Sequence, residues 1–188
     1  MRYNYLISSF LLLSLLLFYS CSSTKTYTET TKATEFEQPF QDKIFQSDEK
    51  YFRSHQSGKS PDLAISKKIA LQNAKSELAG KIQTLIKTVN NQYTNQRSIV
   101  NKQEYENKFE ELSREVIEQE LVDIKTIGEK TYKEKDGSFT YWIAIEVPKD
   151  TILNGINNKI SNNQRLRIDY DMNQFEKIFN DELKKLEK

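Results

Sequence analysis

The chain has 188 residues, with 28 basic and 27 acidic side chains, so its formal net charge at pH 7 is only +1. This balance excludes an overall field that would attract nucleic acid or an anionic membrane surface. A single cysteine excludes a disulfide within the chain, and the length suits one modest domain plus a tail.

The first residues predict a bacterial lipoprotein leader. Arg2 supplies a positive charge, an apolar stretch covers about residues 5–19, and Ser20 precedes Cys21. About 15 apolar residues match the core of a signal peptide, whereas a membrane-spanning helix needs about 20. The run 17–21 resembles a lipobox in the looser, bulkier form of Bacteroidetes-type lipoproteins. We therefore predict a signal peptide at 1–20 and lipidation of Cys21; an ordinary secretory signal and an uncleaved anchor are the alternatives.

The predicted domain organisation follows from this leader. Residues 21–43 are rich in serine, threonine and charge, with Pro39 near the end, and predict a lipidated flexible tether. An α+β domain is expected over 44–150, and a C-terminal helical extension that packs on it over 151–188. Three acyl chains on Cys21, at about 0.8 kcal/mol per buried methylene, would anchor the protein stably.

Residues 51–58 predict a short strand that ends in a turn, and a long helix then begins. Ser60 is expected as its N-cap, Pro61 as its first residue and Asp62 in its first turn. Apolar residues at three- and four-residue spacing predict the buried face of this helix: Ile65, Ile69, Ala70, Ala74, Leu78, Ile82, Leu85, Val89 and Tyr93.

A second helix is predicted at about 102–119, after which the apolar period changes to two. Strands are expected at 121–133 and 139–147, joined by a hairpin turn at Asp136–Gly137. Alternate residues of the second strand, from Phe139 to Val147, should face the long helix, which leaves Trp142 on the opposite face. Pro148 should end the strand because it cannot donate a ladder hydrogen bond.

Two more helices are predicted, at about 150–160 and 163–187. The second has an apolar stripe of helical spacing: Ile168, Met172, Phe175, Phe179, Leu183 and Leu186. Asp169 and Asp171 are interpreted as its capping region, because a calcium site with Asp181 lacks EF-hand spacing. The predicted fold class is α+β: a small antiparallel sheet, made of the N-terminal strand and the C-terminal hairpin, packed on a long amphipathic helix with additional C-terminal helices.

At this level the chain resembles the LPP-twenty lipoprotein family, whose domain type is shared with the amino-terminal domain of the flagellar assembly protein FlgT. The similarity covers roughly residues 45–185 and rests on several segments: Phe52-Arg53-Ser54, Gly58, Ser60-Pro61-Asp62, 70–79, 136–146, and 166–171 with Phe175 and Phe179. It implies an envelope lipoprotein with a small α+β domain. The family carries no established catalytic residues, so none is transferred.

The sequence predicts no catalytic, metal or cofactor site. His55 is the only histidine, and it has no cysteine or second histidine with which to build a typical zinc site. The acidic stretch 104–115 is interpreted as a solvated helix face. Trp142 is the candidate partner contact, because an exposed tryptophan can anchor a protein partner; cover by the C-terminal helix is the competing interpretation.

The expected function is a non-enzymatic binding or scaffold module in the cell envelope. Its expected partners are the membrane, through the lipid on Cys21, and an envelope protein, with no nucleic acid; the oligomeric state stays open. Residues 22–25 contain neither an aspartate nor an acidic run, which favours the outer membrane with the domain facing the periplasm. The alternative is an envelope hydrolase that acts on cell-wall or glycan material through paired carboxylates, for which Glu146 and Asp169 are examples.

Overall fold

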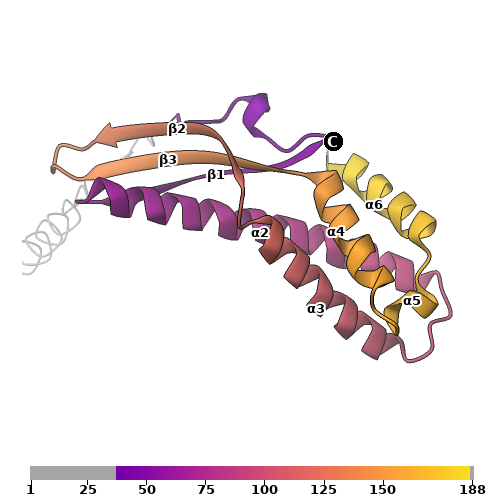
Figure 1. Cartoon of the computed structure of the whole chain (residues 1–188). Helices are drawn as coiled ribbons and strands as arrows, with labels where there is room; N and C mark the ends of the chain where they lie inside the picture. Colours follow the sequence, from indigo (N-terminus) through magenta and orange to yellow (C-terminus); the bar gives the residue numbers. More distant parts are fainter. Residues whose placement is uncertain (1–36, 187–188) are drawn as a thin grey trace, which may run out of the picture. The chain divides into compact units, whose positions relative to one another are not determined.

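The computed structural model describes residues 37–186, and the predicted α+β class is confirmed (Figure 1). The elements, in chain order, are η2 (Lys43–Phe45), β1 (Tyr51–Ser60), α2 (Leu63–Asn95), α3 (Lys102–Glu120), β2 (Lys125–Lys133), β3 (Phe139–Pro148), α4 (Lys149–Ser161), α5 (Leu166–Asp169) and α6 (Met172–Leu186).

The three strands form one antiparallel sheet in the order β1-β3-β2, so the second strand of the hairpin lies in the centre. Tyr51 is paired with Pro148 at one end of β1, and Ser60 with Phe139 at the other. The hairpin turn is where the sequence predicted it, with Gly137 in a left-handed conformation (φ 83°) that favours glycine. Strand β2 begins four residues later than predicted, because Leu121 forms the C-cap of α3 and is buried there.

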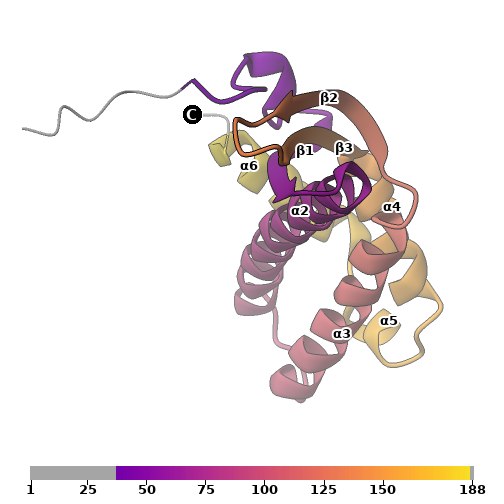
Figure 2. The same ribbon diagram turned by 90° about the vertical axis from the view of Figure 1, so that its left-hand side faces the viewer.

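The long helix α2 lies along one face of the sheet and packs on β1 and β3 (Figures 1 and 2). At their contact, a Cβ added to Gly58 would lie 2.4 Å from the carbonyl oxygen of Ser66 and 2.5 Å from the amide nitrogen of Ala70. The two backbones can therefore approach only because Gly58 has no side chain. Small residues consequently face the sheet at this end of α2.

This close approach corrects two details of the sequence analysis. Ile65 and Ile69 do not belong to the buried stripe: they are 49% and 37% exposed, because the contact with β1 leaves room only for small side chains. The N-cap of α2 is Asp62, not Ser60, since an oxygen of Asp62 accepts from the amide of Ile65 at 3.0 Å. Ser60 is the last residue of β1, and Pro61 precedes the helix instead of opening it.

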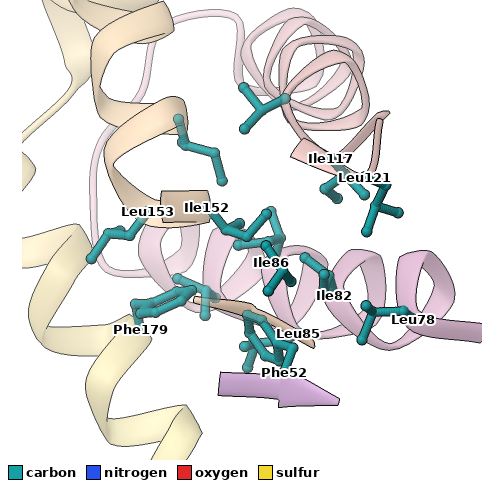
Figure 3. Packing of buried hydrophobic residues seen from close by; sticks show 14 of the residues in the cluster. Phe52, Leu78, Ile82, Leu85, Ile86, Ile117, Leu121, Ile152, Leu153 and Phe179 are labelled. Carbon is teal, nitrogen blue, oxygen red and sulfur yellow. The ribbon is translucent and has the colours of Figure 1, made fainter. Parts of the chain in front are cut away.

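The core joins the sheet to the helical end of the domain. Phe52 of β1, Leu85 of α2 and Phe179 of α6 belong to one buried cluster, to which Ile117 of α3 and Ile152 of α4 also contribute (Figure 3). Towards the end of α2, five aromatic rings from α2, α3, the α5–α6 junction and α6 form one cluster, with neighbouring centroids 5.4–6.5 Å apart: Tyr93, Tyr105, Phe109, Tyr170 and Phe175.

The last predicted helix is in fact two. Tyr170 is extended (φ −95°, ψ 124°) and separates α5 from α6. Asp171 caps α6 by accepting from the amide of Gln174 at 3.1 Å, which confirms the predicted capping region. Because the break turns the first part of the stripe away from the core, Ile168 is 79% exposed and Met172 47% exposed, contrary to prediction.

The three remaining members of the stripe for which the structure describes the side chains, Phe175, Phe179 and Leu183, are buried as expected.

The segment before η2 packs on the sheet. Phe40 is only 6% exposed, and a Cβ on Gly128 of β2 would lie 2.6 Å from its ring. Residues 37–43, placed by the sequence in the flexible tether, therefore contact the domain. The rest of the predicted tether, the signal peptide and Cys21 lie outside the described residues.

Candidate functional site

Trp142 lies on the face of the sheet that points away from α2, as the strand alternation predicted. It is paired with Ser57 of β1 and with Lys130 of β2, and its side chain is half-buried. We call this face the outer sheet face; its β3 residues are Thr140, Trp142, Ala144 and Glu146. Helix α6, which the competing interpretation placed over Trp142, packs on α2. The indole is half-buried between Ser57 and Lys130, and the part of it that is accessible can contact a partner.

An ion-pair network occupies the other end of the outer sheet face. The Arg53 guanidinium lies 2.9 Å from Glu146 and 2.5 Å from Asp48, and Lys125 lies 2.8 Å from the second oxygen of Glu146. Arg53 also donates to the carbonyl of Gln46 at 2.8 Å. The network thus ties the segment before β1 to the sheet.

The network is buried enough to matter for stability. The side chains of Arg53 and Glu146 are only 10% and 6% exposed. Burial alone would raise the pKa of Glu146, but hydrogen bonds from Lys125 and Arg53 outweigh it and the pKa is lowered. A carboxylate held by two cations suits a structural role.

Polar side chains are also found on the face of the sheet that packs on α2. On the face towards α2, Glu77 accepts from Ser54 at 2.8 Å and from Gln56 at 2.7 Å, and Lys81 lies 2.6 Å away. These bonds satisfy polar groups between the sheet and the helix. His55 is paired with Ala144 and so belongs to the outer sheet face. It is half-buried; burial lowers its pKa, Glu77 acts in the opposite direction, and Lys81 lowers the pKa further.

No group of three or more histidine, cysteine, aspartate or glutamate side chains in residues 37–186 is arranged to hold a metal ion. Asp171 caps α6, and Asp181 is paired with Lys184 at 3.5 Å. Glu146 and Asp169, the carboxylates considered for a hydrolase, are not brought together: Glu146 lies on the outer sheet face, whereas Asp169 belongs to α5, which packs on α3 and α4.

The feature that the sequence analysis missed is a groove between α2 and α3, which we call the α2–α3 groove. Its volume is about 440 Å³, within the range of small-ligand sites. Carboxamides line both walls: Gln83, Asn90 and Asn91 from α2, and Asn107 from α3. The groove also contains two cations, Lys87 and Arg114, and two carboxylates, Glu106 and Glu110.

Asn90 is the unusual residue of this groove. It is only 5% exposed, and its Oδ1 has no hydrogen-bond partner among the described residues. Its neighbours are satisfied: Glu106 accepts from Thr94 at 2.8 Å, and Glu110 is paired with Arg114 at 3.0 Å. The sequence offered one indication of this residue: Asn90 is a polar residue on the apolar face of the helix, which it shares with Ile86 and Tyr93.

The two carboxylates of the groove lie one helical turn apart. Glu106 lies 3.6 Å from Lys102, and Glu110 pairs with Arg114 at 3.0 Å. The acidic stretch 104–115 was predicted to be a solvated face; Glu106 within it faces the groove.

Comparisons add no relative from which a function can be transferred. No family model matches the chain, and no curated protein matches it. Within residues 37–186, none of the helices has the length and apolar character that crossing a bilayer requires.

Proposed function

We propose that this protein is a lipid-anchored protein of the cell envelope whose α+β domain acts as a non-enzymatic binding module. The anchor is the lipid on Cys21, and the proposed location is the outer membrane with the domain facing the periplasm. The leader and the lipobox-like run 17–21 support the anchor. The resemblance to the LPP-twenty family supports the same assignment, and membership of that family is part of the proposal.

One geometric observation carries the binding role. Trp142 is half-buried on the outer sheet face, where Phe40 and Phe45 pack next to Gly128, while α2 covers the opposite face (Figure 2). Aromatic anchors that a fold leaves accessible are the residues that most often dominate a protein–protein contact. The proposed partner is therefore an envelope protein that contacts the sheet around Trp142.

The anchor is tested by Cys21→Ser with detergent phase partitioning of cell extracts. The expected result is that the wild-type protein enters the detergent phase and that Cys21→Ser enters the aqueous phase with an unchanged circular dichroism spectrum. Ser23→Ala is the matched control and should partition as the wild type does. Retention of Cys21→Ser in the detergent phase would contradict the lipid anchor. Protease treatment of intact cells tests the facing, since rapid loss of the domain would place it on the cell surface.

The binding role is tested by photo-cross-linking in intact cells. A photoreactive amino acid at position 142 should cross-link to a defined envelope protein, and the same amino acid at the exposed Ile168 should not. If position 142 yields nothing above the background at position 168, the proposed contact surface is wrong, even where the anchor experiment succeeds.

A further inference from the structure

We propose that the α2–α3 groove is a binding site for a neutral, hydroxyl-rich ligand of the oligosaccharide class. This site is separate from the outer sheet face and from the lipid anchor, so it stands or falls independently of the proposed function. Its support has three parts: the unpaired oxygen of Asn90, the polar lining of the groove and the balance of charge.

The first part is the unpaired acceptor. Asn90 is 95% buried and its Oδ1 has no partner in the described chain. A buried acceptor without a donor is costly, and most such groups in folded proteins are paired. A ligand that brings an O–H or N–H into the groove would supply the missing donor. A ligand that fits this site should therefore place a hydrogen-bond donor next to the Oδ1 of Asn90.

The second part is the chemistry of the lining. Four carboxamides and two carboxylates present both donors and acceptors along the groove. A hydroxyl group donates and accepts at the same time, so an array of hydroxyls can satisfy such a mixed lining without a fixed register. Extended peptide backbone presents its donors and acceptors at fixed positions, whereas each hydroxyl group can act as either. Hydroxyl-rich ligands thus match the lining better than peptides do.

The third part is charge. The groove contains two cations and two carboxylates, so its formal charges cancel. Arg114 is already paired with Glu110, and Glu106 lies near Lys102. Neither an anionic nor a cationic ligand finds an excess of opposite charge here. A neutral ligand is the class that this balance favours, and a volume of about 440 Å³ admits more than a single water molecule or ion.

The experiment is a titration of the isotope-labelled domain, monitored by amide chemical shifts, with three probes. These are a trisaccharide of N-acetylglucosamine, a trisaccharide of glucose, and a trialanine peptide blocked at both ends. At millimolar concentrations, at least one of the sugars should shift amides of the groove walls in a saturable way. The Asn90→Leu variant should weaken that binding about tenfold, the loss expected for one hydrogen bond to a buried partner.

Two further variants make the test decisive. Asn180→Leu makes the same chemical change at an exposed position of α6 and should bind as the wild type does. Asn107→Ala removes a carboxamide from an exposed position in the opposite wall, so it should weaken sugar binding without endangering the fold. Asn90→Leu should also raise the melting temperature by about 2–6 °C, because it removes an unpaired buried acceptor.

Several results would overturn the inference. If neither sugar shifts the amides of the groove, the proposed site is wrong. The same holds if Asn90→Leu and Asn107→Ala both bind the sugar as tightly as the wild type does. Binding of the blocked peptide without either sugar would refute the ligand class. A lower melting temperature of Asn90→Leu would show that Oδ1 already has a partner in the free protein, and would remove the first part of the argument.

Discussion

The close approach of β1 and α2 at Gly58 allows a sharp prediction for Gly58→Ala. Gly58 is not in a left-handed conformation, so alanine suits its backbone and the whole effect should be steric. The new Cβ would lie 2.4 Å and 2.5 Å from backbone atoms of α2 and 2.8 Å from the Cβ of Ile69. The helix would have to move by roughly 1 Å to restore ordinary contact, which disturbs a close-packed core.

The expected cost is about 3 kcal/mol, the upper part of the usual range for overpacking, because the atoms in the way are backbone and not a flexible side chain. This corresponds to a fall in melting temperature of about 6–12 °C for a domain of this size. Equilibrium unfolding in urea measures the change directly, with an unchanged dependence on denaturant as evidence of an intact fold.

The matched control is Gly80→Ala. Gly80 is an exposed residue in the interior of α2, where an added Cβ meets nothing within 4 Å. Alanine there should stabilise the domain by about 0.5–1 kcal/mol through helix propensity alone. If Gly58→Ala unfolds within about 0.5 kcal/mol of the wild type, a change typical of an unremarkable surface site, the close approach of β1 and α2 is wrong.

Two further predictions concern buried polar groups. Tyr93→Phe leaves two backbone groups at the α5–α6 junction unpaired and should lower the free energy of unfolding in urea by about 2 kcal/mol. Tyr105→Phe removes a hydroxyl that has no hydrogen-bond partner within residues 37–186, so it should be neutral or stabilising. Equal losses of stability in the two variants would contradict this. Glu146→Gln should cost about 3 kcal/mol at pH 7, because Arg53 stays buried without its full partner. Since the pKa of Glu146 is lowered from 4.5 on folding, its contribution is present above that pH and lost as the pH falls below it. When the free energy of unfolding is measured from pH 7 downwards, it should fall less steeply for Glu146→Gln than for the wild type. An equally steep fall in both proteins would refute the stabilising role of the Glu146 carboxylate.

Much of the fold follows from local patterns in the sequence. The long helix, the hairpin turn at Gly137 and the capping role of Asp171 each depend on residues close together in the chain. Helical spacing, a left-handed glycine and a capping carboxylate act within one or two turns, so periodicity and residue type suffice to predict them.

The candidate site was only partly accessible in this way. Strand alternation placed Trp142 on the outer sheet face, because successive side chains of a strand point to opposite faces. The α2–α3 groove could not be predicted, since its walls come from two helices whose facing residues are set by packing. Asn90 stood on an apolar face, but nothing local indicates that its oxygen finds no donor.

The predicted leader and the predicted lipidation of Cys21 also rest on the sequence alone, because signal peptides and lipidation sites are recognised as short linear patterns. The positions at which the helical periodicity fails to predict burial depend on tertiary contacts. Ile65 and Ile69 lose their place in the core because β1 approaches at Gly58, and the last helix breaks where Tyr93 bonds both sides of Tyr170. In each case a contact distant in sequence outweighs local helical spacing, since a buried backbone group must be paired and two backbones cannot overlap.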